Sequence, residues 1–171
     1  MTPDLTLQLV LLAAFGGLAV TATVTDVRSF RIPNRISIAM VALYAAYALG
    51  GFADPRSGLL AGGIVFAAGV FMFARGWMGG GDVKLLAAVS LWAGTEHVLP
   101  MLLIVTATGG VMSAAEWIRI GGFSRFLLRF HPAMSGSLPV SQVRDQAVVP
   151  YAAAILAGAL YVGVSHLLTL A

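Results

Sequence analysis

The sequence contains no cysteine and few charged residues. Cysteine is absent from all 171 residues, which excludes disulfides, zinc sites built on thiolates and a thiol nucleophile. Charged residues make up 10% of the chain and apolar residues 59%, whereas about a quarter of an ordinary soluble domain is charged. Only three histidines occur, far apart in the sequence, so we expect no metal centre. The composition therefore excludes an ordinary water-soluble domain and is typical of a helical membrane protein.

Six long apolar runs fill most of the chain. A membrane-spanning helix needs about 20 residues, so six helices leave no room for a second domain of the usual size. Backbone polar groups in lipid must be paired within each segment, which predicts α-helices. We therefore predict an all-α fold, with residues 1–171 forming a single polytopic membrane domain of six transmembrane helices. The runs are Leu5–Val24, Ile36–Phe52, Leu59–Ala74, Val83–Gly94, Val98–Trp117 and Tyr151–Leu170.

The positions of the basic residues favour six crossings. The fourth run has only about 12 residues and also fits a re-entrant helix. Six crossings place nine of the ten Lys and Arg residues on one side and only Arg56 on the other, whereas five crossings divide them evenly. Cytoplasmic loops collect Lys and Arg, so the formal charge of +3 reflects topology and not a nucleic-acid partner. This predicts both termini outside the cytoplasm and a cytoplasmic segment at residues 118–149.

Small residues and tryptophans occupy characteristic positions in these runs. Gly58 and Gly62 are four residues apart, as are Ala154 and Gly158, a spacing that lets membrane helices approach closely. We expect these pairs to serve packing. Trp92 stands near the end of the fourth run, where an amphipathic ring favours the headgroup level of the bilayer.

Two aspartates stand on the predicted cytoplasmic side. Asp26 follows the first run, and Asp82 opens the fourth run after Gly79–Gly81. Two close, partly buried carboxylates share one proton near neutral pH, so that one activates water while the other protonates a substrate carbonyl. The three glycines allow a peptide to approach the Asp82 carboxylate. Taken singly, however, Asp26 also fits a solvated loop charge and Asp82 a charge favoured at a helix N-terminus.

The two aspartates stand in motifs that resemble those of the type IV prepilin peptidases, which are membrane aspartic proteases. Asp26 precedes Ile32-Pro33-Asn34, and Asp82 belongs to Gly79-Gly80-Gly81-Asp82 followed by Val83-Lys84-Leu85. A third string before the last run, Val149-Pro150-Tyr151, is similar to the closing element of that family. The resemblance implies that Asp26 and Asp82 are catalytic. It also implies a set of residues that shape the site, namely Pro33, Asn34, Gly79, Gly81 and Lys84.

The resemblance implies an aspartic endopeptidase of the bacterial cytoplasmic (inner) membrane. Its substrates would be prepilins or pseudopilins, whose short basic leader is cut at the cytoplasmic face, just before an apolar helix. The chain lacks the amino-terminal segment with paired cysteines found in bifunctional members. It resembles instead the short, peptidase-only forms of Flp or tight-adherence pilus systems. We therefore expect no methyltransferase activity, no dependence on S-adenosylmethionine and no other cofactor.

Two functions from other classes remain open at this stage. A non-enzymatic membrane scaffold of a pilus or secretion assembly would use the aspartates only to cap helices or pair with arginines. A small transporter would also carry membrane carboxylates, although neither Asp26 nor Asp82 lies in the middle of an apolar run, where transporter sites tend to occur. An archaeal-type preflagellin peptidase is a variant of the protease hypothesis that differs only in substrate.

Overall fold

Helices make up nearly all of the described chain. The computed structural model describes residues 3–29, 31–119 and 151–170, and these residues contain no strand. Of the helices, α1, α3, α4 and α6 are long and apolar enough to cross a membrane, and α2 is a shorter apolar helix of 16 residues. The described part of the chain is all-helical, and its long apolar helices are those of an integral membrane protein. The helices are α1 (Pro3–Ser29), α2 (Asn34–Leu49), α3 (Pro55–Ala74), α4 (Gly80–Arg119) and α6 (Tyr151–Leu168).

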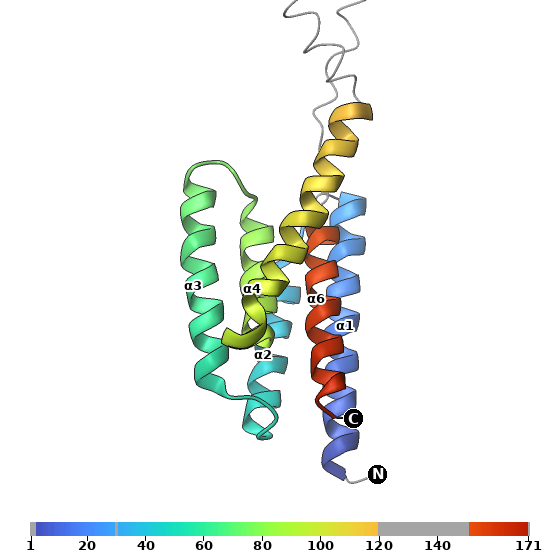
Figure 1. Cartoon of the computed structure of the whole chain (residues 1–171), viewed down its shortest axis with the longest axis vertical. Helices are drawn as coiled ribbons and strands as arrows, with labels where there is room; N and C mark the ends of the chain where they lie inside the picture. Colours follow the sequence, from blue (N-terminus) through green and yellow to red (C-terminus); the bar gives the residue numbers. More distant parts are fainter. Residues whose placement is uncertain (1–2, 30, 120–150, 171) are drawn as a thin grey trace, which may run out of the picture.

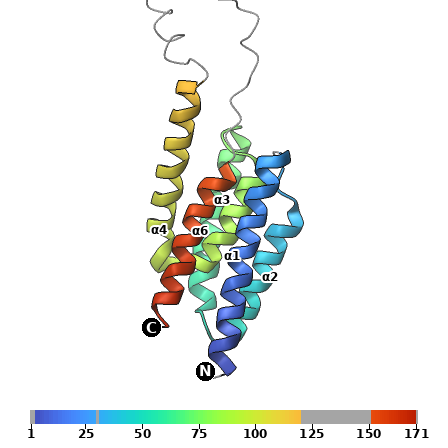
Figure 2. The same cartoon turned by 90° about the vertical axis from the view of Figure 1, so that its right-hand side faces the viewer.

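The predicted count of six helices is not confirmed, because the described residues form five. The fourth and fifth apolar runs belong to one element, α4, which is interrupted by non-helical backbone at Gly94 with φ 60° and ψ −174°. This positive φ suits glycine because it has no Cβ. Figures 1 and 2 show that α4 reverses direction, its first part lying along α3 and its second part along α6. The predicted cytoplasmic segment falls outside the described residues from residue 120 onward.

The expected packing role of the small-residue pairs is confirmed. On α3, a Cβ added at Gly58 would lie 2.6 Å from the backbone oxygen of Leu91, and one at Gly62 would lie 2.8 Å from the Leu91 side chain. On α6, a Cβ at Gly158 would lie 2.5 Å from Val105. The two parts of α4 therefore pack closely against α3 and α6 only because these positions lack side chains.

The interfacial position predicted for Trp92 is wrong, because this residue lies in the core. Its side chain is 2% exposed. The indole stacks on Phe15 with ring centroids 4.5 Å apart, and Nε1 donates a hydrogen bond of 3.2 Å to the carbonyl oxygen of Met40. The apolar run ends after Trp92 because the chain reverses at Gly94.

Side chains from α3 and α6 hold the reversal at Gly94 in place. The Ser57 hydroxyl accepts a hydrogen bond of 2.8 Å from the backbone N–H of Thr95. His166 Nε2 lies 2.8 Å from the carbonyl oxygen of Trp92, where the first part of α4 ends and helix carbonyls lose their intrahelical partners. Because these contacts join three helices, the reversal is a fixed part of the bundle.

The ends of the helices gather at two opposite ends of the bundle. Figure 1 shows the start of α1 and the end of α6 at one end, together with the loop between α2 and α3. The opposite end gathers the end of α1, the start of α2, the turn between α3 and α4, and the start of α6. Both sequence motifs that contain an aspartate lie at this second end.

Candidate active site

The α1–α2 segment and the turn before α4 meet at one end of the bundle. The side chain of Ile32 packs over Gly81, where an added Cβ would lie 3.3 Å from the Ile32 Cβ. Lys84 Nζ donates a hydrogen bond of 2.9 Å to Asn34 Oδ1 and so links residues 50 positions apart. Pro33 directly precedes α2, and its carbonyl accepts a hydrogen bond of 3.0 Å from the Ile36 N–H. The structure therefore brings the site-shaping residues of both motifs together.

The two aspartates also lie together at this end. Asp26 stands in the last turn of α1 and is buried, with 7% of its surface exposed. Asp82 stands in the first turn of α4 and is partly buried. The two side chains are close enough for their charges to interact. Partial burial strengthens such an interaction because little water lies between the charges to screen it. The pair therefore forms a compact acidic site at the rim of the bundle.

Backbone groups from other segments lie against both carboxylates. Ala152, in the first turn of α6, donates a hydrogen bond of 3.2 Å to Asp26 Oδ2. The Thr23 hydroxyl donates to the carbonyl oxygen of the same alanine at 3.1 Å, which fixes α6 against α1. The backbone of Gly79 lies against the Asp82 carboxylate. Because one N–H engages a single lone pair, the bond from Ala152 leaves lone pairs of Asp26 for water or substrate.

Gly79 leaves room for the Asp82 carboxylate because it has no side chain. A Cβ at this position would lie 2.8 Å from Asp82 Oδ2, closer than a carbon atom approaches a carboxylate oxygen. The chain's own backbone thus approaches Asp82 closely at Gly79, and the approach of a substrate peptide stays a prediction. Gly81 serves the packing of Ile32 instead.

The Ala152 contact is the part of the site that the sequence did not predict. It joins residues 126 positions apart, and alanine carries no chemical signal of its own. The available signal was the closing element Val149-Pro150-Tyr151, of which the structure describes only Tyr151, the first residue of α6. Among the residues that the structure describes, no group of three His, Asp or Glu side chains is arranged to hold a metal ion.

The protein is thus a helical membrane bundle with two adjoining carboxylates at one end. Comparison of its sequence with known proteins gives the family. The model of the type IV leader peptidase family matches residues 11–114, more than half of the chain, including both aspartates. The chain therefore belongs to this family. It is 27% identical over 150 residues to the prepilin leader peptidase/N-methyltransferase of Bacillus subtilis (strain 168), an alignment that covers 86% of this chain and 60% of that relative. No solved structure matches significantly.

Proposed function

We propose that the chain is an aspartic endopeptidase that removes the leader peptide of Flp-like prepilins or pseudopilins. The observation that carries the proposal is the pair Asp26 and Asp82, brought together from two helices, with Asp26 held by the backbone N–H of Ala152. Membership of the type IV leader peptidase family supports the same activity. In this proposal both aspartates are catalytic, and Lys84 with Asn34 fixes the segment between α1 and α2 against α4.

The proposed reaction needs one ionised and one protonated carboxyl group. The ionised member takes a proton from water, whose oxygen attacks the carbonyl carbon of the scissile peptide, while the protonated member donates its proton to the carbonyl oxygen. When the tetrahedral intermediate collapses, the C–N bond breaks and the nitrogen of the leaving amine accepts the proton taken from water. As the new C=O bond forms, one hydroxyl of the intermediate returns its proton to the second carboxylate, so both carboxyl groups regain their starting protonation states.

The orientation proposed for this site is cytoplasmic, at the bacterial inner membrane. The aspartate end of the bundle carries most basic residues of the described chain, while Arg56 lies near the start of α3 at the other end. Cytoplasmic loops are enriched in Lys and Arg, so this distribution supports a cytoplasmic aspartate end and external termini. The basic residues at the aspartate end are Arg28, Arg31, Arg35, Arg75, Lys84 and Arg119.

Leader removal can be tested directly in membranes. We expect the protein, produced in a host without its own prepilin peptidase, to shorten a tagged Flp-like prepilin by the mass of its leader. EDTA should leave the rate unchanged because the proposed chemistry needs only carboxylates, and S-adenosylmethionine should add no methyl group to the product. Mass spectrometry of the pilin measures all three. An unprocessed pilin would favour the scaffold hypothesis, and activity lost to EDTA and restored only by a divalent ion would contradict the metal-free mechanism.

The fit between Gly79 and Asp82 gives a second prediction. In Gly79→Ala the new Cβ would meet Asp82 Oδ2 and displace the carboxylate. A displacement of about 1 Å lowers rates by up to about 100-fold, so we expect cleavage to fall roughly 10- to 100-fold. Gly80→Ala is the matched control, because its Cβ would approach only the Phe73 ring, at 3.3 Å. Equal rates for the two variants, measured at equal amounts of folded protein, would show that the position of Asp82 is not limiting.

A further inference from the structure

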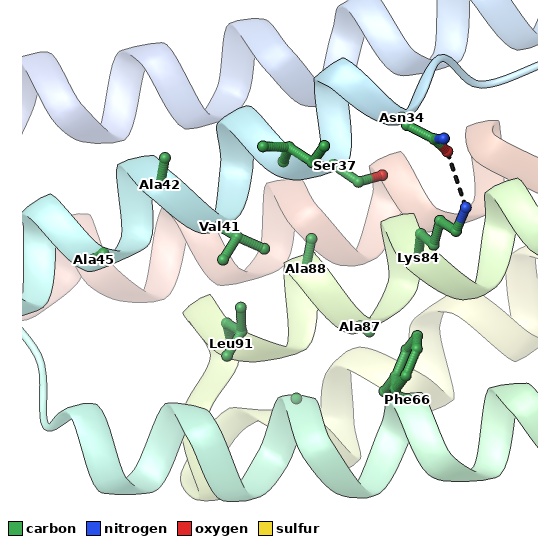
Figure 3. Close-up of a pocket in the computed structure, with 12 residues that line it drawn as sticks. Asn34, Ser37, Val41, Ala42, Ala45, Phe66, Lys84, Ala87, Ala88 and Leu91 are labelled. Atoms are coloured by element: carbon green, nitrogen blue, oxygen red, sulfur yellow. Dashed lines mark hydrogen bonds between the residues drawn. The ribbon is translucent and has the colours of Figure 1, made fainter.

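A lateral groove runs between α2 and α3. Both helices pack against α4, and the space that they leave over its first part has a volume of about 610 Å³. Figure 3 shows α2 along one side of this groove and α3 along the other, with Ala87 and Ala88 of α4 between them. The small side chains of Ala87 and Ala88 line it on α4, so a helix lying here could approach the backbone of α4 closely.

The groove is polar at one end and apolar along the rest of its length. Asn34, Ser37 and Lys84 are its polar lining residues, and in Figure 3 they lie together toward one end. Farther along, the lining consists of side chains such as Val41, Ala45 and Leu91. Any occupant that fits both regions must therefore be apolar along most of its length and polar at one end.

The polar end of the groove adjoins the carboxylate site. Lys84 follows Asp82 by two residues, within one turn of α4, and its ammonium is bonded to Asn34. Side chains two residues apart point to different sides of a helix, so a chain that leaves the groove here emerges at the aspartate end of the bundle and reaches Asp82 by passing the first turn of α4. A substrate cut there would have its apolar part in the groove and its leader outside the bundle.

We propose that this groove binds the apolar helix of the prepilin immediately after the cleavage site, an inference that rests on the proposed function. The peptide bond to be cut must leave the helical conformation, so its backbone N–H and C=O groups lose their partners close to the membrane. The amide of Asn34 and the hydroxyl of Ser37 both donate and accept hydrogen bonds, and Lys84 donates, so together they satisfy both kinds of group. The apolar remainder of the groove takes one face of the helix.

A phospholipid is the competing occupant, since it also combines an apolar part with a polar end. Two features favour a peptide. The small residues along α4 match the close approach of a second helix, whereas flexible acyl chains require no such residues. The polar end offers acceptors as well as donors, although a phosphate group needs donors only. The groove therefore matches a polypeptide better than a lipid.

Site-specific photocrosslinking tests the occupant without requiring cleavage. Ala45 and Ala46 are adjacent exposed residues of α2, but only Ala45 lines the groove. A photoreactive benzophenone residue is placed at either position in the Asp82→Asn protein, together with a tagged Flp-like prepilin in native membranes. We expect a prepilin adduct from position 45 at least about five times as abundant as that from position 46. Equal adducts, or adducts only with phospholipid at position 45, would overturn the proposal.

A blocking substitution tests the same inference through activity. Ala45→Phe fills the groove, whereas Ala46→Phe adds the same ring outside it. We expect the KM for prepilin to rise at least about 10-fold in Ala45→Phe and to change less than about twofold in Ala46→Phe, with similar melting temperatures. An unchanged KM in a folded Ala45→Phe protein would overturn the groove assignment. If no variant, wild type included, cuts prepilin, the proposed function fails, and the crosslinks still decide whether prepilin occupies the groove.

Discussion

Asp82→Asn and Asp26→Asn should each abolish leader removal while leaving the protein folded. An amide can neither take a proton from water nor donate an acidic one, and positioned acid–base groups contribute about 100- to 10,000-fold to rates. In the proposed reaction the two carboxyl groups act on the same water and the same carbonyl, so we expect each single variant to lose at least about 1,000-fold. The double variant should be hardly slower than either single variant, since the rate losses caused by substituting residues that act as a unit do not add up. The measurement is the initial rate of prepilin processing in membranes.

Asp54→Asn supplies the matched control for this experiment. Asp54 precedes α3 at the opposite end of the bundle, where its carboxylate accepts hydrogen bonds from the backbone N–H groups of Arg56 and Ser57. Asparagine caps helices about as well as aspartate, so this variant should process prepilin at the rate of wild type. If either site variant processed prepilin as fast as Asp54→Asn does, the protease assignment would be wrong.

The helices and the two motif-bearing segments were predictable because their signals are local. Apolar runs define most helix positions within a few residues, and the alternation of polar and apolar segments brings Asp26 and Asp82 to one end once the helices pack antiparallel. The resemblance of the two motifs to type IV prepilin peptidases added the expected chemistry, and the family assignment confirms that resemblance.

The parts that escaped prediction depend on contacts between distant residues. Six crossings already predicted a turn between the fourth and fifth apolar runs, but the backbone conformation at Gly94 that makes it could not be derived from residue spacing, because glycine also occurs within these helices. The same reversal makes Trp92 a core residue. Likewise, the hydrogen bond from Ala152 to Asp26 follows from how α6 packs on α1, and a backbone N–H leaves no trace in side-chain chemistry.

The lateral groove also could not be derived from apolar periodicity. It exists because α2 and α3 share α4 as a neighbour without closing over it, whereas hydropathy shows only that both helices are apolar. Residues such as Ala45 and Val41 look like ordinary lipid-facing positions in the sequence. Their place in the groove becomes visible only when the three helices are seen together (Figure 3).

Gly58→Ala should have the largest effect on stability, because the contact between α3 and α4 leaves no room for a side chain at this position. A Cβ at this position would overlap the Tyr44 hydroxyl and lie 2.6 Å from the backbone oxygen of Leu91. The tyrosine can rotate, but a backbone oxygen moves only if the helices separate. Overpacking of this kind costs about 1–3 kcal/mol, and because the obstacle is backbone we expect about 3 kcal/mol for Gly58→Ala. The measurement is the free energy of unfolding in mild detergent or lipid.

Gly63→Ala is the matched control on the same helix, since nothing lies within 4 Å of the position of its Cβ. Alanine favours the helix over glycine by up to about 1 kcal/mol, so this variant should equal or exceed wild type in stability. Because α3 supports the first part of α4, a separation caused by Gly58→Ala would also displace Asp82 and widen the groove. Prepilin processing should therefore fall in Gly58→Ala and persist in Gly63→Ala. Equal stability of the two variants would mean that α3 and α4 do not pack through Gly58.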